Sequence, residues 1–588
     1  MTIEAGLRAA AEAWIADDPD PGDRDELRGL LDRAVSDLDA ATELRDRFAG
    51  RLTFGTAGLR GAVAAGPNRM NRAVVRAATA AVGGWLRGTD GDGDGDGDGD
   101  GTGGRDGSER AVVVGCDARH RSAEFADEVA RVLAGAGIAA HVLPLPCPTP
   151  LLAFAVRHLG AAAGVMVTAS HNPAADNGYK LYLSDGAQVI PPVDREIEAR
   201  IGALGALSDI PVADAGSPLI TRHGDEIVSA YLDAIIAEIG TPDPVALDVV
   251  YTPMHGVAGK LMLRAIAQAG YPAPHMVAAQ AEPDPDFPTV AFPNPEEPGA
   301  LDLALADARR LNADLVLAND PDGDRLAIAV PGPDGWRALT GDQVGALLGA
   351  AQLRWTADEP GSRLASTTIV SSTMLSAIAS AAGVRYAETL TGFKWIVRAA
   401  DRLPGTRFVF GYEEALGYAV GGVVRDKDGM SGALAMLRLA SEAKAAGRSV
   451  LDEYDDLETA HGVHLTSQVT LRTTELAEVM TQLRADPPAR LADQPVTSMV
   501  DHAAAGAAGV GTGAGSGTAG GGLPRADVLV FWLEGARVVL RPSGTEPKIK
   551  CYIEVVEPLA GRSLAQARQA AADRLEPLRE AVQSMLAR

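Results

Sequence analysis

From residue 110 onward, short apolar runs that suit β-strands alternate with longer segments of helical periodicity. This alternation is typical of α/β layers built on parallel or mixed sheets. The predicted strands are 111–115, 139–143, 163–168, 245–251, 313–318 and 407–411, and the predicted helices are 122–136, 255–270, 299–311 and 430–446. A chain of 588 residues has room for about four such domains.

The two ends of the chain follow other patterns. Leucines and a valine at helical spacing predict one helix over residues 24–48. Near the C-terminus we predict strands over 536–540 and 548–555 around a tight loop at 541–547, with a last helix from about residue 563. Apolar and polar residues alternate along 548–555, as in a half-buried strand. This part is predicted to be a smaller α+β domain.

Two low-complexity runs interrupt the pattern. Residues 88–108 are dominated by Asp-Gly repeats, and residues 503–523 are rich in Ala, Gly, Ser and Thr. Neither composition can bury a core, so both runs are expected to be solvated or disordered insertions. The Asp-Gly run also lacks the apolar position that calcium-binding solenoid repeats use to build a core.

Composition restricts the partners and the compartment. The formal net charge of −25 argues against a nucleic acid or an anionic membrane as partner, but a local cluster of Arg and Lys can still bind an anionic small substrate. We see no apolar run long enough to span a bilayer, and residues 1–20 lack the features of a signal peptide. Cys116, Cys147 and Cys551 fit no zinc spacing and suit a reducing compartment. We therefore expect a cytoplasmic protein, and no protein partner can be read from the sequence.

The first candidate site is the stretch 168–173, Thr-Ala-Ser-His-Asn-Pro. It follows an apolar run, so Ser170 stands at the carboxyl end of a predicted strand, where ligands bind in open α/β sheets. A serine there can act as a nucleophile or phosphoryl carrier if a base and cations are near, and His171 and Lys180 supply candidates. A Ser/Asn turn or helix cap is the alternative.

The second candidate site is the stretch 319–325, Asn-Asp-Pro-Asp-Gly-Asp-Arg, which also follows an apolar run. Asp320, Asp322 and Asp324 surround a glycine turn and can converge on one hard cation, without which they would repel one another. The glutamate that would complete an EF-hand is absent. Three protein oxygens leave room for a phosphate ligand, which suits Mg²⁺. The alternative is a solvated acidic turn or a calcium loop.

The third candidate site is the stretch 541–548, Arg-Pro-Ser-Gly-Thr-Glu-Pro-Lys, between two predicted strands. A guanidinium, two hydroxyls, backbone N–H groups at a glycine and an ammonium together suit a phosphate cradle. A β-turn rich in turn-forming residues is the alternative. A fourth stretch, 411–418, carries Glu413 and Glu414, which suit sugar hydroxyls because these both donate and accept hydrogen bonds. Alone, this pair could equally be a surface acidic pair.

Together and in this order, the four stretches resemble the α-D-phosphohexomutase superfamily of phosphoglucomutases and phosphomannomutases. The resemblance covers nearly the whole chain apart from the two low-complexity runs. The Ser170 stretch is similar to the phosphoserine loop of the family, and 320–325 is similar to its metal loop. Residues 411–417 look like its sugar loop and 541–547 like its phosphate loop.

Other stretches extend the resemblance. Residues 55–61 are similar to the N-terminal signature of the family, in which an arginine, here Arg60, approaches the serine site. Further similarity to the branch of bacterial phosphoglucomutases and animal phosphopentomutase-like enzymes lies in 251–256, 292–297, 391–395 and 426–429.

The resemblance implies an architecture of four domains around a central cleft. Three would be α/β domains with mixed sheets, and the fourth a smaller C-terminal α+β domain. The boundaries that we predict are 1–210 for the phosphoserine domain, 211–335 for the metal-binding domain, 336–458 for the sugar-binding domain and 459–588 for the phosphate-binding domain.

The resemblance also implies an activity, that of a phosphosugar mutase, which is an isomerase working as an intramolecular phosphotransferase. Phospho-Ser170 would phosphorylate a sugar monophosphate, for example O6 of glucose 1-phosphate, and recover the other phosphoryl group from the bisphosphate. Glucose 1,6-bisphosphate would thus be both intermediate and activator, and Mg²⁺ would be held by the phosphoserine with Asp320, Asp322 and Asp324.

The resemblance suggests roles for the remaining motif residues. Arg60, Lys180 and Arg325 would stabilise the charge in transfer, and Lys180 or His171 would be the general acid/base. The sugar and its second phosphate would be bound by Lys394, Glu413, Glu414, Arg541, Ser543, Gly544 and Thr545.

Two departures from the family pattern leave the sugar open. Many relatives carry Ser where this chain has Ala415, and some carry His where it has Tyr418. Glucose is our first expectation, with mannose or a pentose as alternatives. A sugar-bisphosphate synthase would use the same loops, and a non-catalytic sugar-phosphate sensor is a remote alternative because no motif residue is lost.

Overall fold

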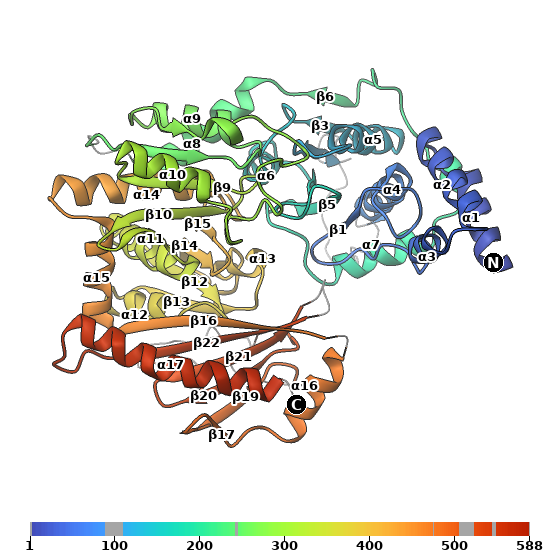
Figure 1. Cartoon of the computed structure of the whole chain (residues 1–588). Helices are drawn as coiled ribbons and strands as arrows, with labels where there is room; N and C mark the ends of the chain where they lie inside the picture. Colours follow the sequence, from blue (N-terminus) through green and yellow to red (C-terminus); the bar gives the residue numbers. More distant parts are fainter. Residues whose placement is uncertain are drawn as a thin grey trace, which may run out of the picture. The chain divides into compact units, whose positions relative to one another are not determined.

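The computed structural model describes residues 3–88, 110–240, 245–473, 475–504, 523–543 and 548–586 (Figure 1). The predictions for the two low-complexity runs fall almost entirely outside these residues. The chain forms two compact units. Unit 1 comprises Met1–Thr241, Asp248–Ala327 and Val423–Leu434, and unit 2 comprises Pro242–Leu247, Ile328–Gly422 and Ala435–Arg588.

Unit 1 begins with three helices, α1 (Ala5–Asp17), α2 (Pro21–Arg33) and α3 (Leu38–Arg47). The prediction of one helix over 24–48 is therefore wrong, because the chain breaks after Arg33. The side chain of Asp37 accepts the N–H of Asp39 at 2.9 Å and starts α3 as an N-cap. Val35 and Leu38, counted in the apolar face, are 43% and 59% exposed, so that face does not run through the break.

The main sheet of unit 1 has the strand order β1-β5-β4-β2-β3-β6. Strands β2, β3, β4 and β6 are parallel, whereas β5 runs antiparallel to β1 and β4, so the sheet is mixed. The bounds are β1 (Leu59–Ala62), β2 (Val112–Cys116), β3 (Ala140–Val142), β4 (Ala163–Val167), β5 (Asp176–Leu183) and β6 (Ile220–Arg222). Its helices are α4 (Arg72–Gly88), α5 (Ser122–Gly135), α6 (Thr149–His158) and α7 (Val193–Gly202).

This sheet positions the first candidate site. Valines of β2 and β4 pack with α4 and α5 in one continuous apolar core, so both strands are buried along their whole length. Strand β4 ends at Val167, and the Ser170 stretch follows at its carboxyl end, as predicted.

A second sheet of unit 1 positions the acidic stretch. Its parallel strands are β7 (Val249–Thr252), β8 (His275–Met276) and β9 (Leu315–Asn319), with helices α8 (Asp225–Ile239), α9 (Gly259–Gln268) and α10 (Asp302–Leu311). Helix α9 starts later than predicted because Met254 and His255 have φ of 49° and 61°, which an α-helix cannot contain. Strand β9 is buried throughout and leads directly into Asp320.

Unit 2 contains a mixed sheet of order β13-β12-β14-β15 and a hairpin of β10 (Leu326–Gly332, in unit 2 from Ile328 onward) with β11 (Gly335–Ala338). The sheet strands are β12 (Ser362–Thr368), β13 (Arg385–Thr389), β14 (Thr406–Glu413) and β15 (Gly417–Val420). The helices are α11 (Gly341–Trp355), α12 (Met374–Ala381), α13 (Phe393–Ile396), α14 (Gly429–Ala445, in unit 2 from Ala435 onward) and α15 (Val450–His461).

The C-terminal part of unit 2 is an antiparallel sheet of order β16-β22-β21-β20-β19. Its strands are β16 (Val463–Arg472), β19 (Ser498–Asp501), β20 (Leu529–Leu533), β21 (Ala536–Pro542) and β22 (Lys548–Glu557). Helix α17 (Leu564–Leu586) packs along one face and shares its apolar core (Figure 1). Helix α16 (Leu476–Ala485) and the pair β17 (Arg490–Leu491) and β18 (Gln494–Pro495) complete this part, so the α+β prediction is confirmed.

The polar-facing side of β22 differs from the prediction. Its alternation suggested a strand with one face in solvent, but Tyr552 and Val539 of β21 pack against Ile369 and Val370. The sheet is therefore covered on both faces around these residues.

In the part of the chain that the structure describes, every helix is too short or too polar to cross a bilayer.

The packing of α11 on β14 gives a test of the fold. A Cβ atom added to Gly345 would lie 2.5 Å from the ring of Tyr412, which is fully buried. We expect Gly345→Ala to lower the free energy of unfolding by about 1–3 kcal/mol, because overpacking forces the ring or the helix to move. Gly6→Ala in α1 is the control, since nothing lies within 4 Å of its added Cβ. Thermal unfolding of both variants measures the effect, and equal midpoints would contradict it.

Candidate functional site

Ser170 is held in a strained conformation at the end of β4. Its φ is +52°, a left-handed value that costs a non-glycine residue roughly 1–3 kcal/mol. The backbone N–H of Ser170 donates to Thr168 Oγ1 at 2.8 Å. Its hydroxyl donates to Asp320 Oδ2 at 2.9 Å and lies 3.2 Å from Nδ1 of His171. The loop thus aims one buried hydroxyl at the acidic stretch.

Arg119 holds this loop in place, a role that the sequence did not suggest. Its guanidinium donates to the backbone oxygens of Ser170 (2.7 Å), Asn172 (2.5 Å), Pro173 (2.7 Å) and Asp176 (3.1 Å). One buried side chain therefore satisfies four carbonyls of an irregular segment, which would otherwise be costly to bury. The only sequence signal is an arginine shortly after an apolar strand.

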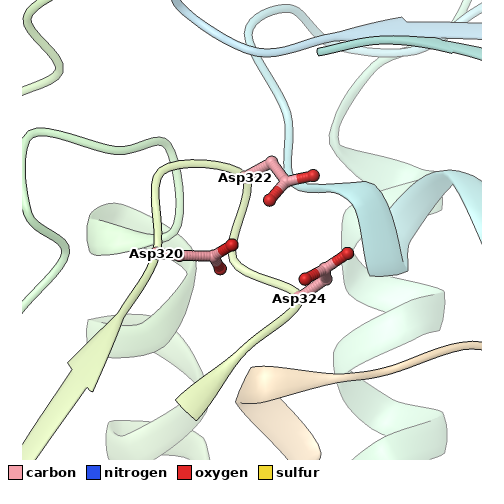
Figure 2. A group of neighbouring side chains, drawn as sticks. All are labelled: Asp320, Asp322 and Asp324. Carbon is pink, nitrogen blue, oxygen red and sulfur yellow. The ribbon is translucent and has the colours of Figure 1, made fainter. Parts of the chain in front are cut away.

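The three aspartates converge as predicted. One carboxylate oxygen from each of Asp320, Asp322 and Asp324 lies within 4.8 Å of the others, and all three residues are buried (Figure 2). Burial, with Asp322 and Asp324 beside it, raises the pKa of Asp320 well above its ordinary value. Asp322 Oδ1 and Asp324 Oδ1 have no hydrogen-bond partner among the described residues. Three buried carboxylates this close together, two of them with an unpartnered oxygen, fit a divalent cation.

Two lysines counter the charge of this triad. The Lys180 ammonium lies 2.8 Å from Asp322 Oδ2 and 3.3 Å from Asp324 Oδ2, and the Lys427 ammonium lies 3.2 Å from Asp324 Oδ2. Burial would lower the pKa of Lys180, but Asp322 and Asp324 outweigh it and raise that pKa, so Lys180 keeps its proton. The sequence predicted a role for Lys180 and missed Lys427, whose stretch served only as a family signature.

The position of Lys427 depends on its two acidic neighbours. Asp426 accepts the hydroxyl of Tyr182 at 2.7 Å, and Asp428 accepts the hydroxyl of Tyr231 at 2.8 Å. All four groups are buried. Two tyrosines that are distant in sequence thus fasten the segment that carries Lys427 within unit 1.

The remaining predicted residues of unit 1 lie around Ser170. Arg60 donates to the Asn172 side chain at 2.8 Å, and Arg325 pairs with Glu296 at 3.3 Å. Burial, and the charges of Arg325 and Arg60, lower the pKa of His171 well below its ordinary value, so its imidazole is neutral. A buried hydroxyl beside a neutral base and several cations can carry an anionic group and pass it on.

A second cluster lies in unit 2. Glu413 accepts the backbone N–H of Gly392 at 2.6 Å, which ties the sugar-loop candidate to the segment that carries Lys394 in α13. Glu414 accepts the hydroxyl of Ser371 at 3.2 Å. Burial, with Glu413 and Asp342 beside it, raises the pKa of Glu414 to about 7. Glu414 can therefore exist in either protonation state near neutral pH.

The third candidate stretch is partly described. Arg541 lies on β21, and the Ser543 N–H donates to the Lys548 carbonyl at 2.8 Å. Gly544 and Thr545 lie outside the described residues. The structure thus brings together the predicted residues of unit 1, whereas the phosphate cradle of unit 2 stays a prediction.

Comparison with family models identifies four matching domains. The models describe the phosphoglucomutase/phosphomannomutase α/β/α domains I, II and III and the C-terminal domain. They match residues 51–206, 229–333, 340–459 and 488–570. The chain order of the predicted domains is the same, and their boundaries at 210, 335 and 458 stay predictions.

Three curated proteins illustrate the range of relatives. A probable phosphomannomutase of Haemophilus influenzae is 40% identical over 496 residues, covering 82% of this chain and 93% of that protein. A probable phosphoribomutase of Schizosaccharomyces pombe is 34% identical over 576 residues, covering 93% of each chain. A phosphoglucomutase of Staphylococcus epidermidis is 33% identical over 515 residues, covering 86% and 90%.

Solved structures share the fold. The Paramecium phosphoprotein pp63/parafusin, a phosphoglucomutase, has a TM-score of 0.65 at 18% identity and covers 92% of this chain and 97% of its own. A phosphoglucomutase/phosphomannomutase family protein of Burkholderia thailandensis has a TM-score of 0.64 at 20% identity, covering 90% and 97%.

The acidic triad predicts cation binding that can be measured directly. Asp322→Asn keeps the size of the side chain but removes one ligand charge, so we expect the dissociation constant for Mg²⁺ to rise about tenfold or more. Isothermal titration calorimetry checks this. Asp334→Asn, at an exposed turn, is the matched control for the loss of one negative charge. Equal Mg²⁺ affinity in the two variants would contradict the site.

Proposed function

Because the chain belongs to the phosphoglucomutase/phosphomannomutase family of the α-D-phosphohexomutase superfamily, we propose that it interconverts glucose 1-phosphate and glucose 6-phosphate. Enzymes of this family are mutases, isomerases that act as intramolecular phosphotransferases, and this chain is one of them. The observation that supports the proposal most is the Ser170 hydroxyl, 2.9 Å from Asp320 and surrounded by cations.

Ser170 would carry the phosphoryl group. In the first half-reaction the bond from phosphorus to Ser170 Oγ breaks while a bond from phosphorus to O6 of glucose 1-phosphate forms. The O6 hydroxyl loses its proton, for which the neutral His171 imidazole is the candidate acceptor, and Ser170 Oγ takes up a proton as the serine hydroxyl is released. In the second half-reaction the phosphoryl group on O1 moves to Ser170 Oγ, the Ser170 hydroxyl loses its proton, O1 takes one up, and glucose 6-phosphate leaves.

Cations of unit 1 would stabilise the group in transfer. Arg60, Lys180 and Arg325 are the predicted donors, and Lys180 is protonated because two aspartates raise its pKa. Lys180 can therefore give a proton but is a poor base, which leaves His171 as the better candidate for that role. Lys427 is a further donor beside the triad.

Asp320, Asp322 and Asp324 would hold Mg²⁺ together with an oxygen of phospho-Ser170. When bound, the ion neutralises charge on the phosphoryl group. The fit rests on the two unpartnered carboxylate oxygens described above.

Residues of unit 2 would recognise the sugar and the phosphate that is not transferred. Glu413 and Glu414 suit sugar hydroxyls, and Lys394 suits a hydroxyl or phosphate oxygen. The phosphate would be bound by Arg541, Ser543, Gly544 and Thr545. Glucose 1,6-bisphosphate would serve as intermediate and activator.

Mannose 1-phosphate is the second candidate substrate, supported by the name of the Haemophilus influenzae relative. The Schizosaccharomyces pombe relative supports a pentose phosphate in the same way. A sugar-bisphosphate synthase would consume another phosphoryl donor stoichiometrically, whereas a mutase needs only a trace of bisphosphate. We further propose that the enzyme acts in the cytoplasm on a small phosphosugar, without a nucleic acid or membrane partner.

The first test is turnover of glucose 1-phosphate with Mg²⁺ and a trace of glucose 1,6-bisphosphate, coupled to NADPH formation from glucose 6-phosphate. We expect Ser170→Ala to lower kcat by at least about 10³-fold, because this variant lacks the hydroxyl that is proposed to carry the phosphoryl group. Ser208→Ala, at an exposed position, is the control. Mannose 1-phosphate and ribose 1-phosphate are assayed in parallel. If the wild-type protein converts none of the three sugar phosphates, the proposal is refuted.

The raised pKa of Glu414 predicts a pH-dependent KM. The carboxylate form accumulates above about pH 7, and an ionised acceptor binds sugar hydroxyls more strongly than a neutral one. We therefore expect KM to fall as pH rises from about 6 to about 8, and Glu414→Gln to remove this part of the change. The ionisation of the substrate phosphate affects the KM of the wild-type protein and of Glu414→Gln equally, so it cancels in their comparison. Identical profiles of KM against pH would show that Glu414 does not titrate in the site.

A further inference from the structure

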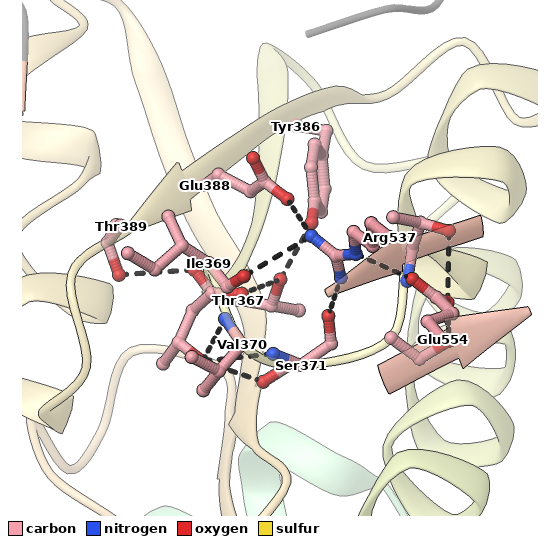
Figure 3. Close-up of polar contacts among 12 residues, drawn as sticks. Thr367, Ile369, Val370, Ser371, Tyr386, Glu388, Thr389, Arg537 and Glu554 are labelled. Atoms are coloured by element: carbon pink, nitrogen blue, oxygen red, sulfur yellow. Dashed lines mark hydrogen bonds and ion pairs between the residues drawn. The ribbon is translucent and has the colours of Figure 1, made fainter. Parts of the chain in front are cut away.

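Arg537 is a buried charge in unit 2 to which neither the motifs nor the proposed mechanism assigns a role. Its guanidinium pairs with Glu554 at 2.7 Å and Glu388 at 3.3 Å. It also donates to the carbonyl oxygens of Ile369, at 3.2 Å, and of Ser371 (Figure 3). Only 4% of the residue is exposed. Arg537 thus joins strand β21 to the segment 369–371, which follows β12.

Glu554 completes the connection from the neighbouring strand. It stands opposite Arg537 in the pairing of β21 with β22. Its other oxygen accepts the Ser372 hydroxyl at 2.8 Å and the Thr373 N–H at 2.7 Å. The pair therefore holds Ile369, Ser371 and Thr373 by backbone groups and Ser372 by its hydroxyl. The side chain of Val370 packs on the sheet instead.

The held segment supports the predicted sugar-binding carboxylate. The Ser371 hydroxyl donates to Glu414 at 3.2 Å and the Thr368 hydroxyl to the same oxygen at 3.4 Å, and these two hydroxyls lie 2.9 Å apart. The backbone of Ser371 binds Arg537 while its side chain binds Glu414. A shift of this one residue would move the carboxylate.

The same strand carries the predicted phosphate-binding arginine. Arg541 follows Arg537 by four residues on β21, so both side chains leave the sheet on the same face, roughly 13 Å apart along the strand. Tyr552 stands between them on β22, opposite Val539, and packs against the held segment. Burial and the nearby carboxylates of Glu414 and Glu413 raise the pKa of Tyr552, whereas Arg541 lowers it, so both binding groups lie near this ring.

We propose that Arg537 is a positioning residue for substrate binding. It fixes the segment 369–371, on which Glu414 rests, to the strand that carries Arg541. Arg537 thereby sets the spacing between the sugar-binding and the phosphate-binding group that this structure shows. The inference rests on the proposed function, which assigns the sugar to Glu414 and a phosphate to Arg541.

A purely stabilising role would not need this arrangement. Well-packed apolar residues often replace a buried ion pair without loss of stability, because both charges must be desolvated. The planar guanidinium instead offers several donors in fixed directions, which sets the geometry of four acceptors at once. A sugar phosphate that binds to two groups at a fixed spacing gains affinity over either contact alone.

The test compares two ligands on one variant. In the double variant Arg537→Met with Glu554→Gln, the main ion pair is neutral and its volume nearly kept, so the chain can still fold. Calorimetric titrations in a Ser170→Ala background avoid turnover. We expect affinity for glucose 6-phosphate to fall about tenfold and that for inorganic phosphate to change less than about twofold. A conservative Arg537→Lys change should recover part of the lost sugar-phosphate affinity.

Arg568→Met is the matched control. Arg568 joins α17 to α15 through Asp455 and Glu458, so it also links the C-terminal sheet domain to the preceding helices. Among the described residues its ion pairs involve neither Glu414 nor the segment 369–371. We expect it to lower thermal stability and leave both affinities unchanged. An unchanged affinity of the folded double variant for glucose 6-phosphate would overturn the proposal, as would an equal loss for both ligands.

The sugar phosphate that the wild-type protein binds tests the proposed function, and the ratio of variant to wild-type dissociation constants tests the role of Arg537. Binding of mannose 6-phosphate or ribose 5-phosphate by the wild-type protein in place of glucose 6-phosphate would contradict the proposed sugar. The sugar phosphate that does bind then replaces glucose 6-phosphate in the titrations of the Arg537 variants. The ratio of variant to wild-type dissociation constants tests Arg537 in either case.

Discussion

Three carboxylates buried within 4.8 Å of one another are the constraint on which unit 1 depends. Ionised carboxylates at this distance repel, and burial removes the water that would screen them. Lys180 and Lys427 counter the charge from two other segments, and Ser170 contributes a hydroxyl. An ammonium is buried only where it is paired, so Lys180 and the triad each justify the burial of the other. The partly buried Lys427 adds a second positive charge beside the triad.

The cations gathered around Ser170 explain how an acidic chain can use an anionic substrate. The net charge of −25 describes the whole surface, whereas Arg60, Lys180 and Arg325 lie around one hydroxyl. Burial, together with the charges of Arg325, Arg60 and Lys180, lowers the pKa of His171 and keeps it neutral. The same charges would attract a phosphate group. Local charge rather than net charge therefore decides which ligand this cluster accepts.

Sequence patterns predicted the parts of the structure that depend on short stretches of chain. The buried strands before Ser170 and Asp320, and the convergence of the three aspartates, follow from apolar runs and from spacing. Arg119 and Lys427 were missed because their partners are distant in sequence. The helix over 24–48 was wrong because a local cap at Asp37 outweighed a continuing apolar period. The apolar spacing alone could not show where that cap would act.

Arg537 is another residue whose role sequence patterns could not predict, in this case on a strand. An arginine within an apolar antiparallel strand ordinarily indicates a solvent-facing position. Here the second face of the sheet is covered by the segment after β12, and the guanidinium becomes buried between two carboxylates. Unit 1 and unit 2 thus use one physical device, since in each a buried cation and buried carboxylates fix loop segments that have no regular hydrogen-bonding pattern of their own. In unit 1 the fixed group is a reactive hydroxyl, and in unit 2 it is a carboxylate suited to recognition. Charges retained in the interior at the cost of desolvation are therefore where this protein's geometry is most closely specified.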